Sequence, residues 1–263
     1  MTSIASGKFF RTLRIFILLA ILIGVGMSAW TTKVRTTSWD YPLRVVVYPV
    51  NGDGSEASSQ YIDSLEKETF KSIEEFMESE AKYYGLKLSN PFTIKLAPRV
   101  DNLPPEPPQD RNVFHIIWWS LKLRYWAYRV NTYDGPTGDI RAFVLYYDPA
   151  THKALAESLG LQKGLICVAK VFANRKMEEK NNIVIAHELL HTVGATDKYD
   201  LTTGQPIFPD GYSDPEKEPL YPQKEAEIMA CRIPLSETEA KMPESLYDTV
   251  VGHKTAREIR WID

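Results

Sequence analysis

The chain is poor in cysteine, and this scarcity excludes a small fold held together by disulfides. Cys167 and Cys231 are the only two cysteines among 263 residues, too few for a disulfide framework. Their spacing is not that of a metal-binding cysteine pair. We expect two buried thiols, with a single bridge between them as the alternative in an oxidising compartment.

The chain also lacks an excess of basic residues, any internal repeat and any low-complexity tract. Its formal net charge is -3 and its isoelectric point is near 6.0, so no basic field is available to bind phosphates. We therefore expect no nucleic-acid partner. The region 40–263, about 220 residues long, is sufficient for one well-buried domain and short for two.

Only one long apolar run is present, from Ile15 to Trp30, and basic residues precede it. Its sixteen residues are slightly fewer than the ~20 that span a membrane. We predict an uncleaved transmembrane signal anchor over residues 15–31, with a signal peptide cleaved between Ser28 and Ala29 as the alternative. The expected organisation is a cytoplasmic basic tail (1–14), this anchor, a linker (32–39) and one folded domain (40–263).

The basic residues before the apolar run predict which side of the membrane the domain occupies. Positive charge favours a cytoplasmic N-terminus, although Lys33 and Arg35 on the other side oppose this orientation. We therefore expect a single-pass membrane protein whose folded domain, 40–263, is periplasmic or extracellular. With a cleaved signal peptide, the domain would be secreted.

One run of eleven residues, from His187 to Asp197, predicts a metal site more sharply than any other part of the chain. His187 and His191 are four residues apart, so a helix would place both imidazoles on one face, within reach of one ion. Glu188 would be rotated from His187 by about 100°, away from the ligand pair but close to a water on the ion. This pattern indicates one zinc ion per chain, with Glu188 as the catalytic general base.

The third metal ligand is predicted from the residues that follow the helix. Gly194 suits a left-handed turn that ends the helix, and such a turn would bring Asp197 back beneath the metal. A catalytic zinc usually has three protein ligands, and a carboxylate oxygen is an ordinary one. Other carboxylates remain open as alternatives to Asp197: Asp200, Glu216, Glu218 and Glu225.

The pattern HExxHxxGxx followed by a ligand resembles the metzincin clan of zinc peptidases. In that clan the third ligand is usually histidine and in some members aspartate, which Asp197 would match. The clan also has a methionine-containing turn beneath the zinc, and Met229 in Ile228-Met229-Ala230 fits that role in type and distance. The methionine packs and does not bind the metal. The resemblance implies a zinc peptidase of unassigned subfamily.

Alternating strands and helices predict an α+β fold. We expect strands at 43–49, 92–96, 141–147 and 164–172, and helices at 58–84, from Asn181 or Asn182 to 193, and at 243–262. The aromatic stretch 114–130 fits either a helix or a strand, and its length favours a helix. Its aromatic side chains are expected to pack in the core rather than to stack on substrate. This order is similar to the metzincin architecture, a twisted sheet with helices on one side. The resemblance also implies that 165–173 borders the cleft and pairs with substrate, with an internal strand as the alternative.

The long proline-containing segment 198–225 is expected to wall the cleft. Its carboxylates match no calcium loop that we can specify. Several tyrosines are candidates to stabilise an oxyanion, and the sequence does not choose among them: Tyr199, Tyr212, Tyr221 and Tyr247. The three histidines outside the motif have no ligand spacing.

Taken together, the residues predict a membrane-associated zinc peptidase that hydrolyses peptide or protein substrates. His187, His191 and Asp197 would hold the metal. Two alternatives use the same residues: a non-catalytic zinc-stabilised binding or assembly module, and a zinc hydrolase of non-peptide amides or esters. Glu188 separates the first of these from an enzyme, because a structural zinc site has no use for a base.

Overall fold

The computed structural model describes residues 3–110, 112–155, 158–162 and 164–263, which divide into two compact units, 1–38 and 39–263. The described part of the first unit is one helix, α1 (Ser3–Thr37). Across the described residues, no helix combines the length and the hydropathy needed to cross a membrane. The predicted membrane anchor at 15–31, and the single-pass location derived from it, are therefore wrong. The apolar run of sixteen residues is shorter than a span requires, and basic residues border it on both sides.

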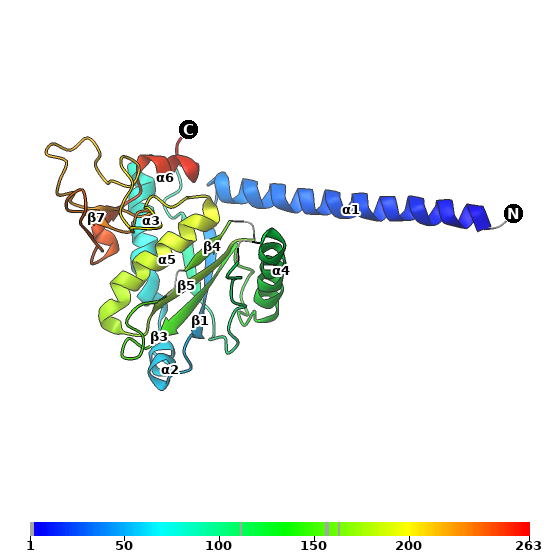
Figure 1. The fold of residues 1–263 in the computed structure, drawn as a ribbon, viewed down its shortest axis with the longest axis horizontal. Coiled ribbons are helices and arrows are strands. Elements are labelled where there is room, and N and C mark those ends of the chain that lie inside the picture. The colour runs from blue at the N-terminus through cyan, green and yellow to red at the C-terminus, as the bar shows by residue number, and fades with distance from the viewer. Residues whose placement is uncertain (1–2, 111, 156–157, 163) are drawn as a thin grey trace. The chain divides into compact units, whose positions relative to one another are not determined.

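The second unit is built on a twisted, mostly parallel sheet, which confirms the predicted α+β class (Figure 1). Its strands follow the order β2-β1-β3-β5-β4. All neighbours are parallel except β4, which runs antiparallel to β5. The strands are β1 (Leu43–Asn51), β2 (Phe92–Leu96), β3 (Ile140–Tyr147), β4 (Leu159–Leu161) and β5 (Ile166–Phe172).

Helices cover both faces of this sheet, because side chains that alternate along the strands bury two separate cores. Val45 and Val47 face a core shared with α2 (Glu56–Asp63), α3 (Lys71–Tyr83) and α5 (Glu178–Val193). Val46 and Tyr48 face a second core with α4 (Val113–Arg129). The expected arrangement, with all helices on one side of the sheet, therefore differs from the structure at α4.

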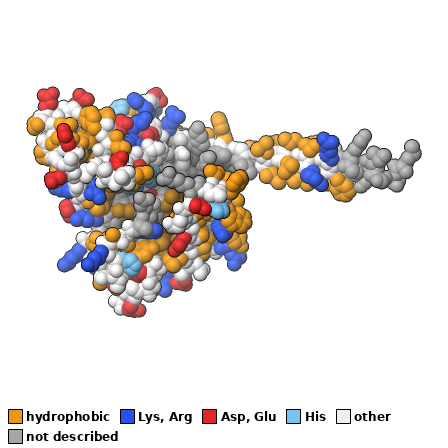
Figure 2. Space-filling view, viewed as in Figure 1, with side chains coloured by type: hydrophobic (Ala, Val, Ile, Leu, Met, Phe, Trp, Pro, Cys, Tyr) orange, Lys and Arg blue, Asp and Glu red, His pale blue; other side chains and the backbone are white. Residues whose placement is uncertain are grey.

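The aromatic stretch forms α4, as its length favoured, but only part of it packs in the core. Trp119 is buried, and Trp126 lies against Phe143 with ring centroids 4.5 Å apart. Trp118 and Tyr125 are exposed, and Figure 2 shows hydrophobic side chains gathered over this helix. Because α4 and α5 cover opposite faces of the sheet, these aromatic side chains lie away from the predicted metal site.

Two predicted helices differ from the observed ones. The single helix expected at 58–84 is divided into α2 and α3, with the short 3-10 helix Lys67–Phe70 between them. Glu66 and Thr69 form a reciprocal capping box there, which starts a new helix. The helix expected at 243–262 is reduced to α6 (His253–Glu258). Before it come the 3-10 helix Leu246–Asp248 and β9 (Thr249–Val250), which pairs with β6 (Ala226–Glu227).

Candidate metal centre

Helix α5 carries His187, Glu188 and His191, and the side chains of two asparagines form hydrogen bonds between its N-terminal half and neighbouring elements. The Asn181 side chain accepts a hydrogen bond from the Phe172 amide at 3.2 Å and donates to its carbonyl at 2.8 Å. Asn182 donates to Thr69 O at 2.7 Å and Ser72 Oγ at 2.9 Å. The helix begins at Glu178, so neither asparagine is the predicted N-cap. Instead they join α5 to β5 and to the start of α3.

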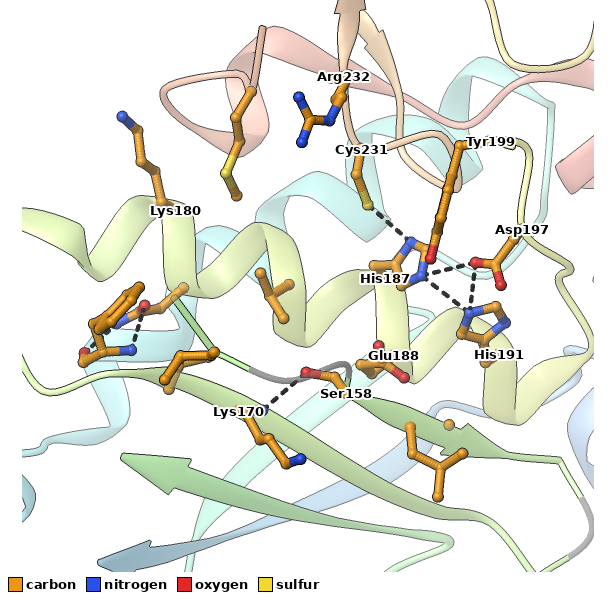
Figure 3. Close-up of a pocket in the computed structure, with 18 of the residues that line it drawn as sticks. Ser158, Lys170, Lys180, His187, Glu188, His191, Asp197, Tyr199, Cys231 and Arg232 are labelled. Atoms are coloured by element: carbon orange, nitrogen blue, oxygen red, sulfur yellow. Dashed lines mark hydrogen bonds and ion pairs between the residues drawn. The ribbon is translucent and has the colours of Figure 1, made fainter. Parts of the chain in front are cut away.

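The predicted ligand atoms converge on one point. His187 Nε2 and His191 Nε2 are 3.0 Å apart, and Asp197 Oδ1 lies 3.2 Å from the first and 3.1 Å from the second (Figure 3). Within the part of the chain that the structure describes, these three residues are the one group whose geometry could hold a metal ion. The four alternative carboxylates, from Asp200 to Glu225, lie outside this group.

The other nitrogen of each imidazole contacts a backbone carbonyl. His187 Nδ1 donates to Ile228 O at 3.1 Å, and His191 Nδ1 donates to Ala195 O at 2.9 Å. Because a carbonyl can only accept, these contacts place a proton on each Nδ1, so each Nε2 has a lone pair when its imidazole is neutral and donates to Asp197 when it is protonated. With both imidazoles neutral, three electron-rich atoms, two Nε2 and one Oδ1, face each other. A cation between them removes this repulsion, and carbonyl partners of this kind are what orient metal-binding histidines.

The charges of the cluster favour a cation at the same place. Burial would raise the pKa of Asp197, but hydrogen bonds from His187 and His191 outweigh it and hold that pKa below its usual range. Burial would lower the pKa of His187, but the nearby Cys231 and Asp197 raise it well above its usual value. The two shifts indicate that the surroundings of His187 favour positive charge and that Asp197 stays ionised, and a metal ion can supply that positive charge in place of a proton.

A turn and an ion-pair network place Asp197. Gly194 ends α5 in the left-handed region at φ 116°, which an L side chain rarely adopts. Glu258 of α6 accepts hydrogen bonds from Thr196 N at 2.9 Å, Thr196 Oγ1 at 2.9 Å and Lys198 Nζ at 2.7 Å. Lys198 is 4% exposed. The residues on both sides of Asp197 are therefore held by one carboxylate from the end of the chain.

The methionine turn lies directly behind His187. Met229 is fully buried in the core beneath α5, and its preceding residue supplies the carbonyl that binds His187 Nδ1. The Met229 carbonyl accepts from Lys198 N at 3.0 Å. Through its backbone carbonyls, this turn therefore contacts both His187 of α5 and the segment that follows Asp197.

A buried carboxylate that the sequence reasoning missed holds this turn. Glu227 is fully buried and accepts four hydrogen bonds, from Met229 N, Ala230 N, Gly252 N and Thr255 Oγ1, at 2.6–3.1 Å. Burial raises its pKa, against these hydrogen bonds. Its only signal in the sequence is its place beside the turn, and glutamate at such a position is normally a surface residue.

Both cysteines are free thiols, as expected, but only Cys167 is buried, whereas Cys231 is half-buried. Cys167 is buried in β5, and burial raises the pKa of its thiol well above the usual value. Cys231 Sγ lies 3.1 Å from His187 Nδ1, the nitrogen opposite the ligand atom. In this arrangement Cys231 contacts the back of the imidazole and does not reach the point where the ligand atoms meet.

The cluster lies in a cleft of about 700 Å³. Helix α5 contributes Glu188, which is 5% exposed and lines the cleft beside the histidines. Strand β4 forms the opposite wall and approaches α5 so closely that a Cβ atom at Gly160 would lie 2.5 Å from the Glu188 carbonyl and against the His191 side chain. The sequence reasoning missed this short strand and its glycine.

The structure separates the tyrosine candidates. Tyr199 lines the cleft, with its ring 6.4 Å from that of His187. Tyr212 and Tyr221 bond to each other through their hydroxyls at 2.7 Å, and Tyr247 donates to Glu75 at 3.1 Å. None of these three is among the residues that line the cleft. Tyr199 and Leu201 are the part of the segment 198–225 that walls it.

The candidate substrate-binding strand is only partly an edge. Residues Ile166 to Val168 of β5 pair with β3 on one side and β4 on the other, which makes this half of the strand internal. The free edge of the sheet beside the cleft belongs to β4, whose outer side pairs with no strand among the described residues.

Comparisons with known proteins add little. No protein-family model matches the sequence, and no curated protein matches it. A solved structure described as "Structure of a chaperone-substrate complex" has 10% sequence identity and a TM-score of 0.39. The match covers 84% of this chain and 33% of that one, so this chain spans about a third of that protein's length. A likeness at this TM-score carries no argument about fold or function.

Proposed function

We propose that this protein is a zinc-dependent peptidase of the metzincin type. The observation that carries the proposal is the convergence of two imidazole nitrogens and one carboxylate oxygen at 3.0–3.2 Å from each other, beside a glutamate in a cleft. This donor set leaves room for a substrate or water, which is typical of catalytic zinc sites.

The distances support zinc as the ion. A tetrahedral ion with ligands at about 2.0–2.1 Å holds neighbouring ligand atoms roughly 3.3–3.4 Å apart. The three observed separations, 3.0, 3.1 and 3.2 Å, are only slightly shorter. Two imidazoles and one carboxylate suit zinc better than magnesium or calcium, which prefer oxygen ligands.

The residues around the site suit amide hydrolysis. A bound zinc ion would supply a Lewis acid and lower the pKa of a water molecule. We assign to Glu188 the role of taking a proton from the attacking water and returning it to the leaving amine as the C–N bond breaks. The hydroxyl of Tyr199 is the donor we assign to the oxyanion that develops on the carbonyl. The free edge of β4 can hold an extended peptide by main-chain hydrogen bonds.

Three further features support the metzincin type. Gly194 makes the left-handed turn that precedes the third ligand. Met229 is buried in a turn whose carbonyl binds the first histidine. Glu188 lines an open cleft, which favours an enzyme over the alternative of a zinc-stabilised binding module.

The test is cleavage of a mixed peptide library by the full chain with zinc supplied, analysed by mass spectrometry. Glu188→Ala should remove cleavage while zinc stays bound, because the base is lost and the ligands remain. Glu179→Ala, on an exposed position of the same helix, is the matched control and should cleave like the parent. Equal cleavage by the Glu188→Ala protein, or none by the zinc-loaded parent, would contradict the proposal.

A further inference from the structure

The charged side chains that line the cleft are mainly basic. Lys170, Lys180 and Arg232 reach it from β5, from α5 and from the segment after the methionine turn. The described acidic side chains that line it are Glu188 and Asp197, to which we have already given roles. The chain as a whole carries a net charge of -3, so this positive cleft is a local feature.

Two of these cations lie along one side of the cleft. Lys180 is seven residues before His187, two turns along α5 and about 10 Å away along the helix axis. Arg232 follows Cys231, whose sulfur contacts His187. Figure 3 shows the Arg232 side chain extending from its backbone toward the end of the helix that carries Lys180. An extended peptide advances about 3.3 Å per residue, so Lys180 is about three peptide residues from His187 along the cleft, whereas Arg232 adjoins the residue that contacts His187.

The two cations differ in how they are paired. Lys180 Nζ forms an ion pair at 2.9 Å with Glu244, whose side chain is 79% exposed. Arg232 is exposed and has no acidic partner within ion-pair distance among the residues that the structure describes. A guanidinium presents a planar fork that matches a carboxylate in a bidentate manner. Arg232 is therefore the cation available to an incoming acidic group.

Apolar side chains also line the cleft. They are Met177, Val184 and Met242, and Met242 follows the strand that pairs with the segment after Arg232. Such a lining can hold the methylene groups of a side chain while its carboxylate reaches the guanidinium. A lysine or arginine side chain at this place would meet like charge.

We propose that the cleft selects peptides with a glutamate or aspartate beside the scissile bond, and that Arg232 recognises the acidic group. This inference rests on the proposed peptidase function and names the substrate class of the same site. A charge-assisted hydrogen bond of this kind corresponds to about a tenfold preference over the uncharged isostere. The preference should fall as ionic strength rises, because the guanidinium is exposed.

The experiment compares two peptides that differ only by glutamate or glutamine beside the bond cleaved in the library. For the zinc-loaded full chain, kcat/KM should be about tenfold higher with the glutamate peptide. Arg232→Gln should reduce this ratio to about threefold or less, and Arg232→Glu should reverse it, so that the glutamine peptide is cleaved with the higher kcat/KM. Lys87→Gln, which removes one exposed positive charge outside the cleft, should keep the parental ratio.

A binding measurement separates this inference from the catalytic proposal. Fluorescence anisotropy with the Glu188→Ala chain measures the affinity of the same two peptides without turnover. Tighter binding of the glutamate peptide that is lost in the Glu188→Ala, Arg232→Gln double variant would support acidic selection, even if the parent cleaved neither peptide. Cleavage of both peptides with equal kcat/KM would overturn acidic selection and leave the peptidase proposal intact.

Discussion

The carboxylate of Glu258 holds the loop that presents Asp197, so its replacement by glutamine tests how the third ligand is placed. Glu258 accepts from Thr196 N, Thr196 Oγ1 and Lys198 Nζ at 2.7–2.9 Å. The Lys198 side chain is 5% exposed and that of Glu258 is 18% exposed. Glu258→Gln keeps the shape but leaves the Lys198 ammonium in the interior with neutral acceptors only, Thr196 O and Oγ1 at 2.7 and 2.8 Å.

The expected loss of stability follows from these contacts. A hydrogen bond to a charged group contributes about 1.5–3 kcal/mol, and removing one partner of a buried pair costs up to about 5 kcal/mol. Because glutamine still offers a carbonyl oxygen, we expect a loss of about 1.5–3 kcal/mol in the free energy of unfolding. We also expect metal affinity to fall by about tenfold or more, as is typical when a group that orients a ligand is lost.

Two measurements on the full chain check this prediction. Urea unfolding of the parent and the Glu258→Gln variant, without metal, gives the change in stability. Competition with a chelating dye gives the change in zinc affinity. Glu78→Gln, at an exposed position of α3, is the matched control and should change neither. A Glu258→Gln protein with parental zinc affinity would refute the role of this network in placing Asp197, even if the protein were less stable.

Two further predictions concern stabilisation of the oxyanion by Tyr199 and the dependence of the free energy of unfolding on acidic pH. Tyr199→Phe should lower kcat by roughly 100-fold with KM little changed, because the lost hydrogen-bond donor acts in the transition state. Tyr247→Phe, outside the cleft, is the control and should cleave peptides at the parental rate. Equal kcat values for the two variants would show that Tyr199 does not stabilise the oxyanion. Burial would raise the pKa of Asp53, but backbone hydrogen bonds from Asp148 and Ser55 outweigh it and lower that pKa to about 2. Its contribution to stability, up to about 2 kcal/mol, is therefore complete above its ordinary pKa near 3.8 and is lost as pH falls through about 2. Asp53→Asn should flatten the pH dependence of urea unfolding in this window, and an unchanged slope would contradict the assignment.

The parts of the fold that the sequence predicted are those set by local pattern. The strand expected at 92–96 has the same bounds as β2, and the helix that carries His187 and His191 ends at Gly194 as expected. Each depends on periodicity or on the conformational freedom of glycine, which act within a few residues. The sequence predicted one helix over 58–84 because its apolar residues keep a period close to 3.6 residues. The capping box at Glu66, which divides this stretch into α2 and α3, does not disturb that period.

The supporting residues of the site were not predictable from local pattern, because each acts across a long separation. Gly160 of β4 contacts the helix near Glu188, and β4 is only three residues long, too short to show a strand period. Glu227 binds Thr255, and Glu258 binds Lys198, across 28 and 60 residues. A single glutamate in a sequence is normally read as a surface residue, and only the tertiary structure shows that these two are held by buried donors.

The metal site depends on both local and long-range contacts. The helix brings His187 and His191 together by itself, but Asp197 and the carbonyl of Ile228 reach the cluster only when the methionine turn and α6 are packed. The complete set of three ligands therefore exists only in the folded second unit. Metal binding and folding of this unit should be coupled, so zinc should raise its stability by an amount that grows with the logarithm of the free zinc concentration above the dissociation constant.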